Sequence, residues 1–368
     1  MITITGTPES LPSMHDPLYF VVTSDNAAEL NFKYVFDVLI GGVQVARVKL
    51  FPDLNGKGIF DASNIVRNYW TSYFKPNSTQ TAFSYQGNDI YVSYQVRFGE
   101  EFDNTLTPNL TSGNYKAYNF APPFFRSYAS SYLSGFDDKF LTNRDKLNLT
   151  YHSTEKLYVS YFQDASGSVT LQANSTSGSA QTCGSFVLLD ISPAALNTYF
   201  ASTVVQSGSD YTVTIGSQTL TVKNVCTKYP TASLHFLNEL GGYDTAAFRL
   251  VNRETRNIEK KDFDKKQWVQ DGSGMSNTDT YKRRRGGVVT YWVNQTVGMK
   301  LSTDYLTKTD HDWLRELITS PEVWYEQDGI YFPATVKTNN WEEKLRVADK
   351  NFNLTLEIEL GNTNGQYQ

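Results

Sequence analysis

The fold is decided by residues 288–301, which read Val-Val-Thr-Tyr-Trp-Val-Asn-Gln-Thr-Val-Gly-Met-Lys-Leu. β-Branched and aromatic residues dominate this stretch, and that composition is typical of β-strands. The stretch therefore predicts one long strand, or two strands broken near Gly298.

A short helix is expected next. Thr309 is the predicted N-cap, and Asp310 and Asp312 in the first turn suit the helix dipole. Ser320–Pro321 ends the helix, because the residue before proline is pushed out of the α region. The apolar face of this helix consists of Trp313, Leu314, Leu317 and Ile318.

Three more strands are predicted after the helix. Residues 323–325 and 331–332 flank the turn Gln327–Gly329, which is a good hairpin signal. In residues 352–360, apolar and polar residues alternate cleanly. One helix can cover one face of such a sheet, so the other face or an edge must be covered by something else, such as another subunit.

The N-terminal part predicts a second sheet-plus-helix unit. Strands are expected at 16–24, 32–39, 43–50 and 90–98, with Gly41–Gly42 as a tight turn. Between them, Asp61 or Ser63 is the predicted cap of a helix that carries Ile65, Val66, Tyr69, Trp70 and Tyr73 on one stripe. The two units resemble each other in pattern only, since no residue-level repeat is present.

The middle of the chain has short strands at regular spacing and turns rich in Gly and Ser, which suggests a small β-sandwich. The predicted fold is therefore mainly β (α+β), with two sheet-plus-helix modules around a β-sandwich. Predicted strands lie at 147–151, 157–162, 169–173, 185–190, 211–215 and 219–225, and residues 173–184 are expected to form an exposed loop. The predicted domains are 1–126, 127–232 and 233–368, the last with a polar loop or long hairpin at 252–285.

Composition excludes several classes of protein. With 40% hydrophobic and 19% charged residues, the chain can bury a core and is not disordered. A net charge of −5 argues against a general nucleic-acid binder. No signal peptide and no membrane span is visible in the sequence. Two cysteines, Cys183 and Cys226, do not make a disulfide framework, although they could pair or remain free thiols.

The sequence nominates no catalytic set. The four histidines lie far apart, and His311 is expected to be a solvated residue in the first turn of its helix. Glu342 and Glu343 are adjacent, so on a strand their side chains would point to opposite faces and could not flank one sugar bond. We therefore expect a protein that is not an enzyme and that binds no cofactor or metal.

Contacts with partners are expected instead. Lys282–Arg285 is the only basic run, and it suggests either a solvated loop or an electrostatic contact with an acidic neighbouring subunit or with passing DNA. Trp268 and Tyr325 could bind sugar, although core or interface packing is the commoner role of such residues. The candidate interface residues are Tyr69, Trp70, Tyr243, Asp244, Lys282, Arg283, Arg284, Arg285, Trp324 and Tyr325.

Three groups of residues resemble an uncharacterised group of virion proteins from tailed bacteriophages of Bacteroidota hosts. The first group comprises 17–22, 31–34 and 57–61, and the second is Phe140–Arg144. The third is residues 234–245, Leu-His-Phe-Leu-Asn-Glu-Leu-Gly-Gly-Tyr-Asp-Thr, for which we expect a buried strand, a sharp turn at the glycine pair and an acidic, aromatic tip.

This resemblance implies a structural virion component of the tail, neck or baseplate, similar to a distal tail or hub protein, made in the bacterial host cytoplasm. It implies modules that join into a homo-oligomeric ring of three-, six- or twelvefold symmetry and contact other tail or neck proteins. The alternative is a receptor- or glycan-binding appendage, similar to a tail fibre, in which the predicted β-sandwich would bind the ligand.

Overall fold

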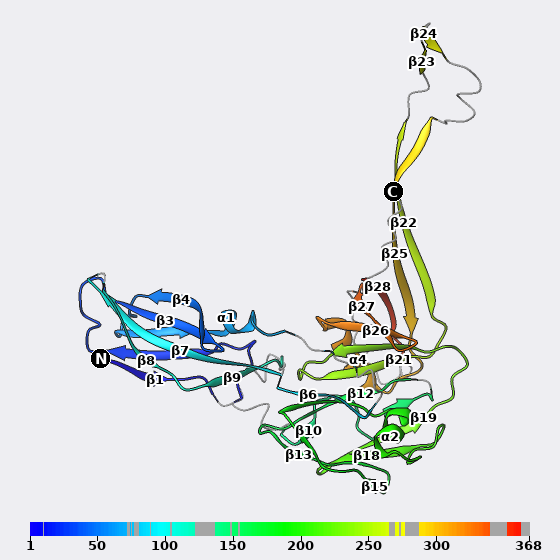
Figure 1. The fold of residues 1–368 in the computed structure, drawn as a ribbon, viewed down its shortest axis with the longest axis horizontal. Helices are drawn as coiled ribbons and strands as arrows, with labels where there is room; N and C mark the ends of the chain where they lie inside the picture. Colours follow the sequence, from blue (N-terminus) through cyan, green and yellow to red (C-terminus); the bar gives the residue numbers. More distant parts are fainter. Residues whose placement is uncertain are drawn as a thin grey trace. The chain divides into compact units, whose positions relative to one another are not determined.

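A computed structural model describes residues 1–9, 11–71, 74, 76, 81–88, 90–103, 105–121, 137–147, 149–153, 155–264, 269–271, 274–276, 287–338 and 352–361. The chain is mainly β with few helices, which confirms the predicted fold class (Figure 1). The chain divides into two compact units. Unit 1 comprises Met1–Cys226, His235–Thr245 and Thr319–Pro321, and unit 2 comprises Thr227–Leu234, Ala246–Ile318 and Glu322–Gln368.

Unit 1 contains two hydrophobic cores. The first core lies among the N-terminal strands and is built on buried aromatic side chains such as Phe20, Tyr34, Phe36 and Phe98. Its sheets have the orders β1-β2-β5 and β4-β3-β7-β8, with β9 also paired to β7. The strands are β1 (Ile2–Gly6), β2 (Tyr19–Ser24), β3 (Lys33–Ile40), β4 (Val43–Leu50), β5 (Lys57–Asp61), β7 (Tyr91–Phe102), β8 (Thr105–Thr111) and β9 (Tyr115–Tyr118).

The predicted helix of this region is much shorter than expected. Helix α1 spans only Ser63–Arg67, and single turns follow it as far as Trp70. β-Branched and aromatic residues have modest helix propensity, so a short stripe of them does not sustain a long helix. The N-cap is Ala62, which makes no side-chain hydrogen bond, so the predicted cap at Asp61 or Ser63 is wrong. Asp61 lies one residue earlier, and its Oδ1 accepts hydrogen bonds from the backbone N–H groups of Leu18 and Ser63. Tyr73, the last residue of the predicted stripe, lies outside the described residues.

A buried carboxylate ties together three strands of the N-terminal sheet. Asp37 on β3 is only 3% exposed, and it accepts hydrogen bonds from Arg47 on β4 and Arg97 on β7 at 2.6–3.1 Å. Burial favours the neutral acid and would raise the pKa of Asp37. The hydrogen bonds and charges of the two arginines outweigh that effect, so the pKa of Asp37 lies below its usual value.

This arrangement predicts a loss of stability in acid. A carboxyl group with a depressed native pKa stabilises the fold fully above its unfolded value of about 3.9, and this contribution is lost as pH falls through the native pKa. Urea unfolding should therefore show a large stability difference between the wild type and Asp37→Asn at about pH 6 and a smaller one at about pH 3. An equal difference at the two pH values would contradict the assignment.

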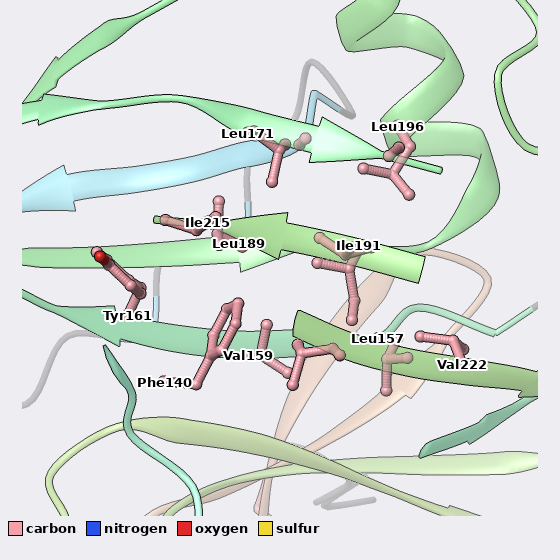
Figure 2. Close-up of a cluster of buried hydrophobic side chains, with 14 of the residues drawn as sticks. Phe140, Leu157, Val159, Tyr161, Leu171, Leu189, Ile191, Leu196, Ile215 and Val222 are labelled. Atoms are coloured by element: carbon pink, nitrogen blue, oxygen red, sulfur yellow. The ribbon is translucent and has the colours of Figure 1, made fainter. Parts of the chain in front are cut away.

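The second core of unit 1 lies between a four-stranded and a five-stranded sheet. Figure 2 shows residues of this core, with Phe140 and Val159 from one sheet and Leu171 and Ile215 from the other. The four-stranded order is β10 (Lys139–Phe140), β12 (Tyr158–Phe162), β17 (Phe186–Asp190), β6 (Phe83–Gly87). The five-stranded order is β11 (Leu149–Tyr151), β19 (Gln218–Asn224), β18 (Tyr211–Ile215), β14 (Leu171–Ala173), β15 (Thr176–Ser177).

Three features of this region differ from the sequence-based expectation. Strand β6 belongs to the second core although it lies inside the predicted N-terminal module. Part of the loop predicted at 173–184 forms β16 (Gln181–Cys183), which pairs with β13 (Gly167–Val169). Helix α2 (Pro193–Phe200) was not predicted, and Leu196 from it enters the core.

Unit 2 is built on a seven-stranded sheet, although the ends of β20 and β21 belong to unit 1. The order is β21 (Tyr243–Phe248), β20 (Ala232–Leu237), β26 (Val323–Gln327), β27 (Ile330–Val336), β28 (Thr355–Leu360), β25 (Val288–Ser302), β22 (Arg253–Asp264). A separate pair, β23 (Val269–Asp271) and β24 (Gly274–Ser276), lies between β22 and β25 in the sequence. Residues 288–301 therefore form one strand without a break at Gly298.

Local signals in this part predicted the structure well. The β26–β27 hairpin turns at Asp328 and Gly329, both with positive φ, as the turn type requires. Helix α4 (Lys308–Thr319) ends before Pro321 as predicted. Its cap is Thr307 rather than Thr309, because the Thr307 hydroxyl accepts from the backbone N–H of Asp310 at 3.1 Å and donates to the Asp310 carboxylate at 2.8 Å.

Candidate assembly interface

The most exposed element of unit 2 is a two-stranded ribbon. β22 pairs with β25 over their whole length, from Arg253 opposite Lys300 to Asp264 opposite Val288. Within the described residues, β28 pairs with residues 298–302 of β25 on one side and with β27 on the other. Residues 256–264 and 288–297 pair with each other beyond the part of β25 that β28 covers (Figure 1). We call these two segments the ribbon.

The ribbon exposes apolar side chains that strands normally bury. All twelve residues of β22 are exposed. Ile258 is 55% exposed, Phe263 46%, Val288 69% and Tyr291 56%. An isolated two-stranded hairpin is at best marginally stable in water, so such an element is better explained if something covers it in an assembly.

Aromatic residues and one lysine gather toward the far end of the ribbon. The rings of Phe263 and Tyr291 meet edge to face with centroids 5.9 Å apart. The Lys261 Nζ lies 4.5 Å from the ring centroid of Trp292, in cation–π geometry. A bulge between Lys261 and Asp262 places an extra residue in β25 here, which lets Tyr291 and Trp292 both contact β22. This group of four side chains is called the aromatic cluster below.

The base of the ribbon carries a small hollow of about 220 Å³ over Gly298. Glycine is needed there, because a Cβ on Gly298 would lie 2.9 Å from the Thr255 Oγ1 and 3.0 Å from the Ile358 carbonyl oxygen. The hollow is bordered by two ion pairs, Lys300–Glu357 at 3.2 Å and Lys337–Glu359 at 3.0 Å. These groups are exposed and already paired, so the hollow is a polar feature of the sheet surface with no excess charge to attract an ion.

Two predicted interface residues lie in a partly exposed position in unit 1. Tyr69 is 48% exposed, whereas Trp70 packs partly against the first core. In unit 2, Trp324 is half-buried and donates from Nε1 to Glu322 at 2.7 Å. Tyr325 is only 7% exposed, and burial raises its pKa, so it is unsuited to the sugar contact considered for it. The basic run 282–285 and Trp268 lie outside the described residues.

The expected acidic, aromatic tip at Tyr243 and Asp244 is wrong, because both residues are 2% exposed. The 235–245 segment instead packs into unit 1 against the Phe140–Arg144 stretch. Thr142 donates from its hydroxyl to the Asp244 carboxylate at 2.8 Å, and Asn238 donates from Nδ2 to the Leu141 carbonyl at 2.7 Å. The Phe140–Arg144 stretch and the 235–245 segment, which the sequence analysis identified separately, are therefore in contact and hydrogen-bonded to each other.

His235 lies at the centre of this contact but is fully buried. Its Nδ1 lies 2.9 Å from the Thr245 Oγ1, which also accepts from the backbone N–H of Tyr158 at 2.8 Å. The rings of Phe74 and Tyr158 lie 5.5 Å and 5.0 Å from the imidazole. A histidine enclosed in this way has no route to a substrate, and its role is to fix the 235–245 segment.

The structure also places His311 and the two cysteines. His311 is 4% exposed and lies 5.1 Å from the Phe352 ring, so the expected solvated position is wrong. Local sequence patterns could not reveal this contact, because residue 352 is far from His311 in the sequence. Cys183 is buried and Cys226 exposed, and both are free thiols. Burial raises the pKa of Cys183 to about 11. Within the described residues, no group of three His, Cys, Asp or Glu side chains could hold a metal ion. Glu342 and Glu343 fall outside them.

None of the helices that the structure describes is both long and apolar enough to cross a membrane. No protein-family model matches the chain, and no curated protein matches it.

Proposed function

We propose that this chain is a structural, non-catalytic component of a bacteriophage virion, a tail or baseplate protein of the distal-tail or hub kind that assembles into a ring through β-sheets shared between subunits. The observation that carries the proposal is the ribbon, which exposes apolar side chains and whose strand β22 is the last strand of the seven-stranded sheet. Unpaired edges and exposed aromatic side chains are features that assembly covers. The resemblance of the 17–22, 140–144 and 234–245 stretches to virion proteins supplies the phage context.

The proposal is tested by the mass of the purified protein in solution, measured by light scattering after size exclusion, followed by imaging of any oligomer. A closed ring of three, six or twelve copies is the expected result. A protein that stays monomeric at high concentration, and that adds no mass when mixed with other tail proteins, would contradict it.

A glycan-binding appendage is the second candidate, and the aromatic cluster favours it. Exposed aromatic rings beside polar groups can stack on sugars as readily as they can pack against a protein. The distinguishing experiment is retention of the pure protein on immobilised host polysaccharide. If a monomeric protein is retained on the polysaccharide, the appendage is favoured. If the protein forms a ring that does not bind the polysaccharide, the tail component is favoured.

A triple substitution in the aromatic cluster distinguishes its contribution to assembly from its contribution to the stability of the fold. Phe263→Ser, Tyr291→Ser and Trp292→Ser together are expected to abolish the oligomer, because they remove the aromatic part of the exposed apolar surface of the ribbon. The thermal unfolding midpoint should change little, since these side chains belong to neither hydrophobic core of unit 1. The control is Tyr305→Ser, an aromatic residue of unit 2 that is 74% exposed and lies outside the ribbon. If the triple variant keeps the wild-type mass, the aromatic cluster has no part in assembly.

A further inference from the structure

One face of the N-terminal sheet carries more cations than carboxylates. This face belongs to the β4-β3-β7-β8 sheet and points away from the first core, which takes the alternate residues of the same strands. The charged residues that the structure describes on it are Lys33, Asp37, Arg47, Lys49, Arg97 and Glu101. Four cations thus accompany two carboxylates, in a chain whose net charge is −5. Anions are therefore attracted to this face although the protein as a whole is acidic.

Asp37 holds Arg47 and Arg97 side by side on this face. Both guanidinium groups bind the carboxylate through Nε and Nη2, at 2.6–3.1 Å. The Nη2 of Arg97 also donates to the Gln44 Oε1 at 2.8 Å, and the Nη2 of Arg47 lies 3.5 Å from the same oxygen. Two like charges are thus held together by one carboxylate. Asp37 balances only one of them, so the pair keeps one positive charge.

The arginine pair also keeps hydrogen-bond donors that the sheet does not use. Within the described residues, the Nη1 amino group of neither Arg47 nor Arg97 makes a hydrogen bond. The two side chains are 36% and 33% exposed, so a solute can reach them. Each Nη1 offers two N–H donors, and the bonds to Asp37 fix the planes of both guanidinium groups. Planar groups with such donors match the oxygens of a carboxylate or a phosphate.

A second group of charges lies beside this pair on the same face. Glu101 forms ion pairs with Lys33 at 3.7 Å and with Lys49, which leaves another positive charge without a balancing carboxylate on the sheet. Lys49 and Arg47 are two residues apart on β4, so their Cα atoms are separated by about 7 Å. Two positive charges this close together attract a dianion more strongly than a monoanion.

We propose that Arg47 and Arg97 form a binding site for an oxyanion, with a preference for a doubly charged group such as a phosphate monoester. The oxyanion accepts hydrogen bonds from the two Nη1 groups, and Lys49 adds positive charge nearby. Asp37 is a positioning residue that holds both guanidinium groups in place. The affinity for inorganic phosphate is expected in the millimolar range, because water weakens charge interactions at an exposed site. The site lies in the N-terminal sheet and does not depend on the proposed assembly.

Isothermal titration calorimetry with inorganic phosphate tests the proposal at about pH 8, where the phosphate is mainly a dianion. Sodium chloride holds the ionic strength constant. Arg47→Gln and Arg97→Gln are each expected to weaken phosphate binding about tenfold, because each removes a hydrogen bond between charged groups. Arg47→Lys keeps the charge but not the planar group, and it should also bind more weakly.

The matched control is Arg67→Gln, which removes the same charge from an exposed arginine on α1 that donates to Asn64. This variant should bind phosphate like the wild type. Circular dichroism checks that each variant is folded. If the arginine variants do not fold, Lys49→Gln replaces them, since it leaves the arginine pair and Asp37 in place. It should weaken the binding of phosphate more than the binding of acetate.

The outcomes that contradict the proposal are distinct. A wild-type protein that takes up no phosphate well above millimolar concentrations has no such site. Equal binding by the wild type and the arginine variants would place the phosphate elsewhere on the protein. A loss in Arg67→Gln as large as in Arg47→Gln would show a general charge effect without a site. Acetate that binds as tightly as phosphate would overturn the preference for a dianion.

Discussion

Replacing Gly241 with alanine is expected to lower the unfolding free energy of unit 1 by about 2–5 kcal/mol. Gly241 has φ +78°, a left-handed conformation that costs a residue with a Cβ about 1–2 kcal/mol. The added Cβ would also lie 1.9 Å from the Asn119 carbonyl oxygen, so the backbone of one segment must move. Urea unfolding followed by tryptophan fluorescence and circular dichroism measures the loss.

Two other glycines separate the contributions to this loss. Gly41 has φ +58°, and no atom lies within 4 Å of the position that an added methyl group would take, so Gly41→Ala reports the conformational cost alone. Gly113 has neither a positive φ nor a close neighbour, and Gly113→Ala should be nearly neutral. If Gly241→Ala costs no more than Gly41→Ala, the close approach of the 235–245 segment to Asn119 is not present in solution.

Asn238→Ala is expected to cost unit 1 about 3 kcal/mol, because the amide makes three hydrogen bonds in a buried site, each worth about 1 kcal/mol. Its Oδ1 accepts from the backbone N–H groups of Leu240 and Gly242 at 3.0 and 2.9 Å. Its Nδ2 donates to the Leu141 carbonyl at 2.7 Å, which joins the turn to the neighbouring stretch. Alanine leaves all three backbone groups without this partner.

The matched control is Asn197→Ala. The Asn197 amide also makes three hydrogen bonds to backbone groups, with Val204 N–H and with the N–H and carbonyl of Val205, at 2.8–2.9 Å. That site is only half-buried, so water can replace the lost partners and a smaller loss is expected. Equal losses in the two variants would show that burial of the Asn238 turn is not what makes its bonds important.

Sequence patterns predicted the structural elements that are determined by residues close together in the sequence. The turns at Gly41–Gly42 and Asp328–Gly329 need positive φ, and glycine beside alternating strands reveals them. Proline marks the end of α4 for a similar reason. The long strand β25 followed from its composition, although its length as a single strand did not, because a glycine can either break a strand or allow a close neighbour.

Contacts between distant segments could not be predicted in this way. Strand β6 joined the second core through pairing with β17, about a hundred residues away. Tyr243 and Asp244 looked like an exposed tip because a turn with charged and aromatic residues usually faces solvent. They are buried because Leu141 and Ser160 close over the turn, where a Cβ on Gly242 would lie within 3 Å of both. The ribbon was foreseen only as a loop or hairpin within 252–285, without the residues that it exposes.

The chain segments that form unit 1 are not consecutive, and this affects how the protein folds during its synthesis. Residues 235–245 belong to unit 1 although they follow Cys226 and the start of unit 2 in the chain. During translation, the contacts between this segment and the rest of unit 1 can therefore form only after residues 235–245 have been made. Until then the surface that receives it, around Leu141 and Ser160, is open to water and to chaperones. A fragment truncated near residue 226 would keep both hydrophobic cores of unit 1 and lose only the contacts of this segment, so it would leave that surface exposed permanently.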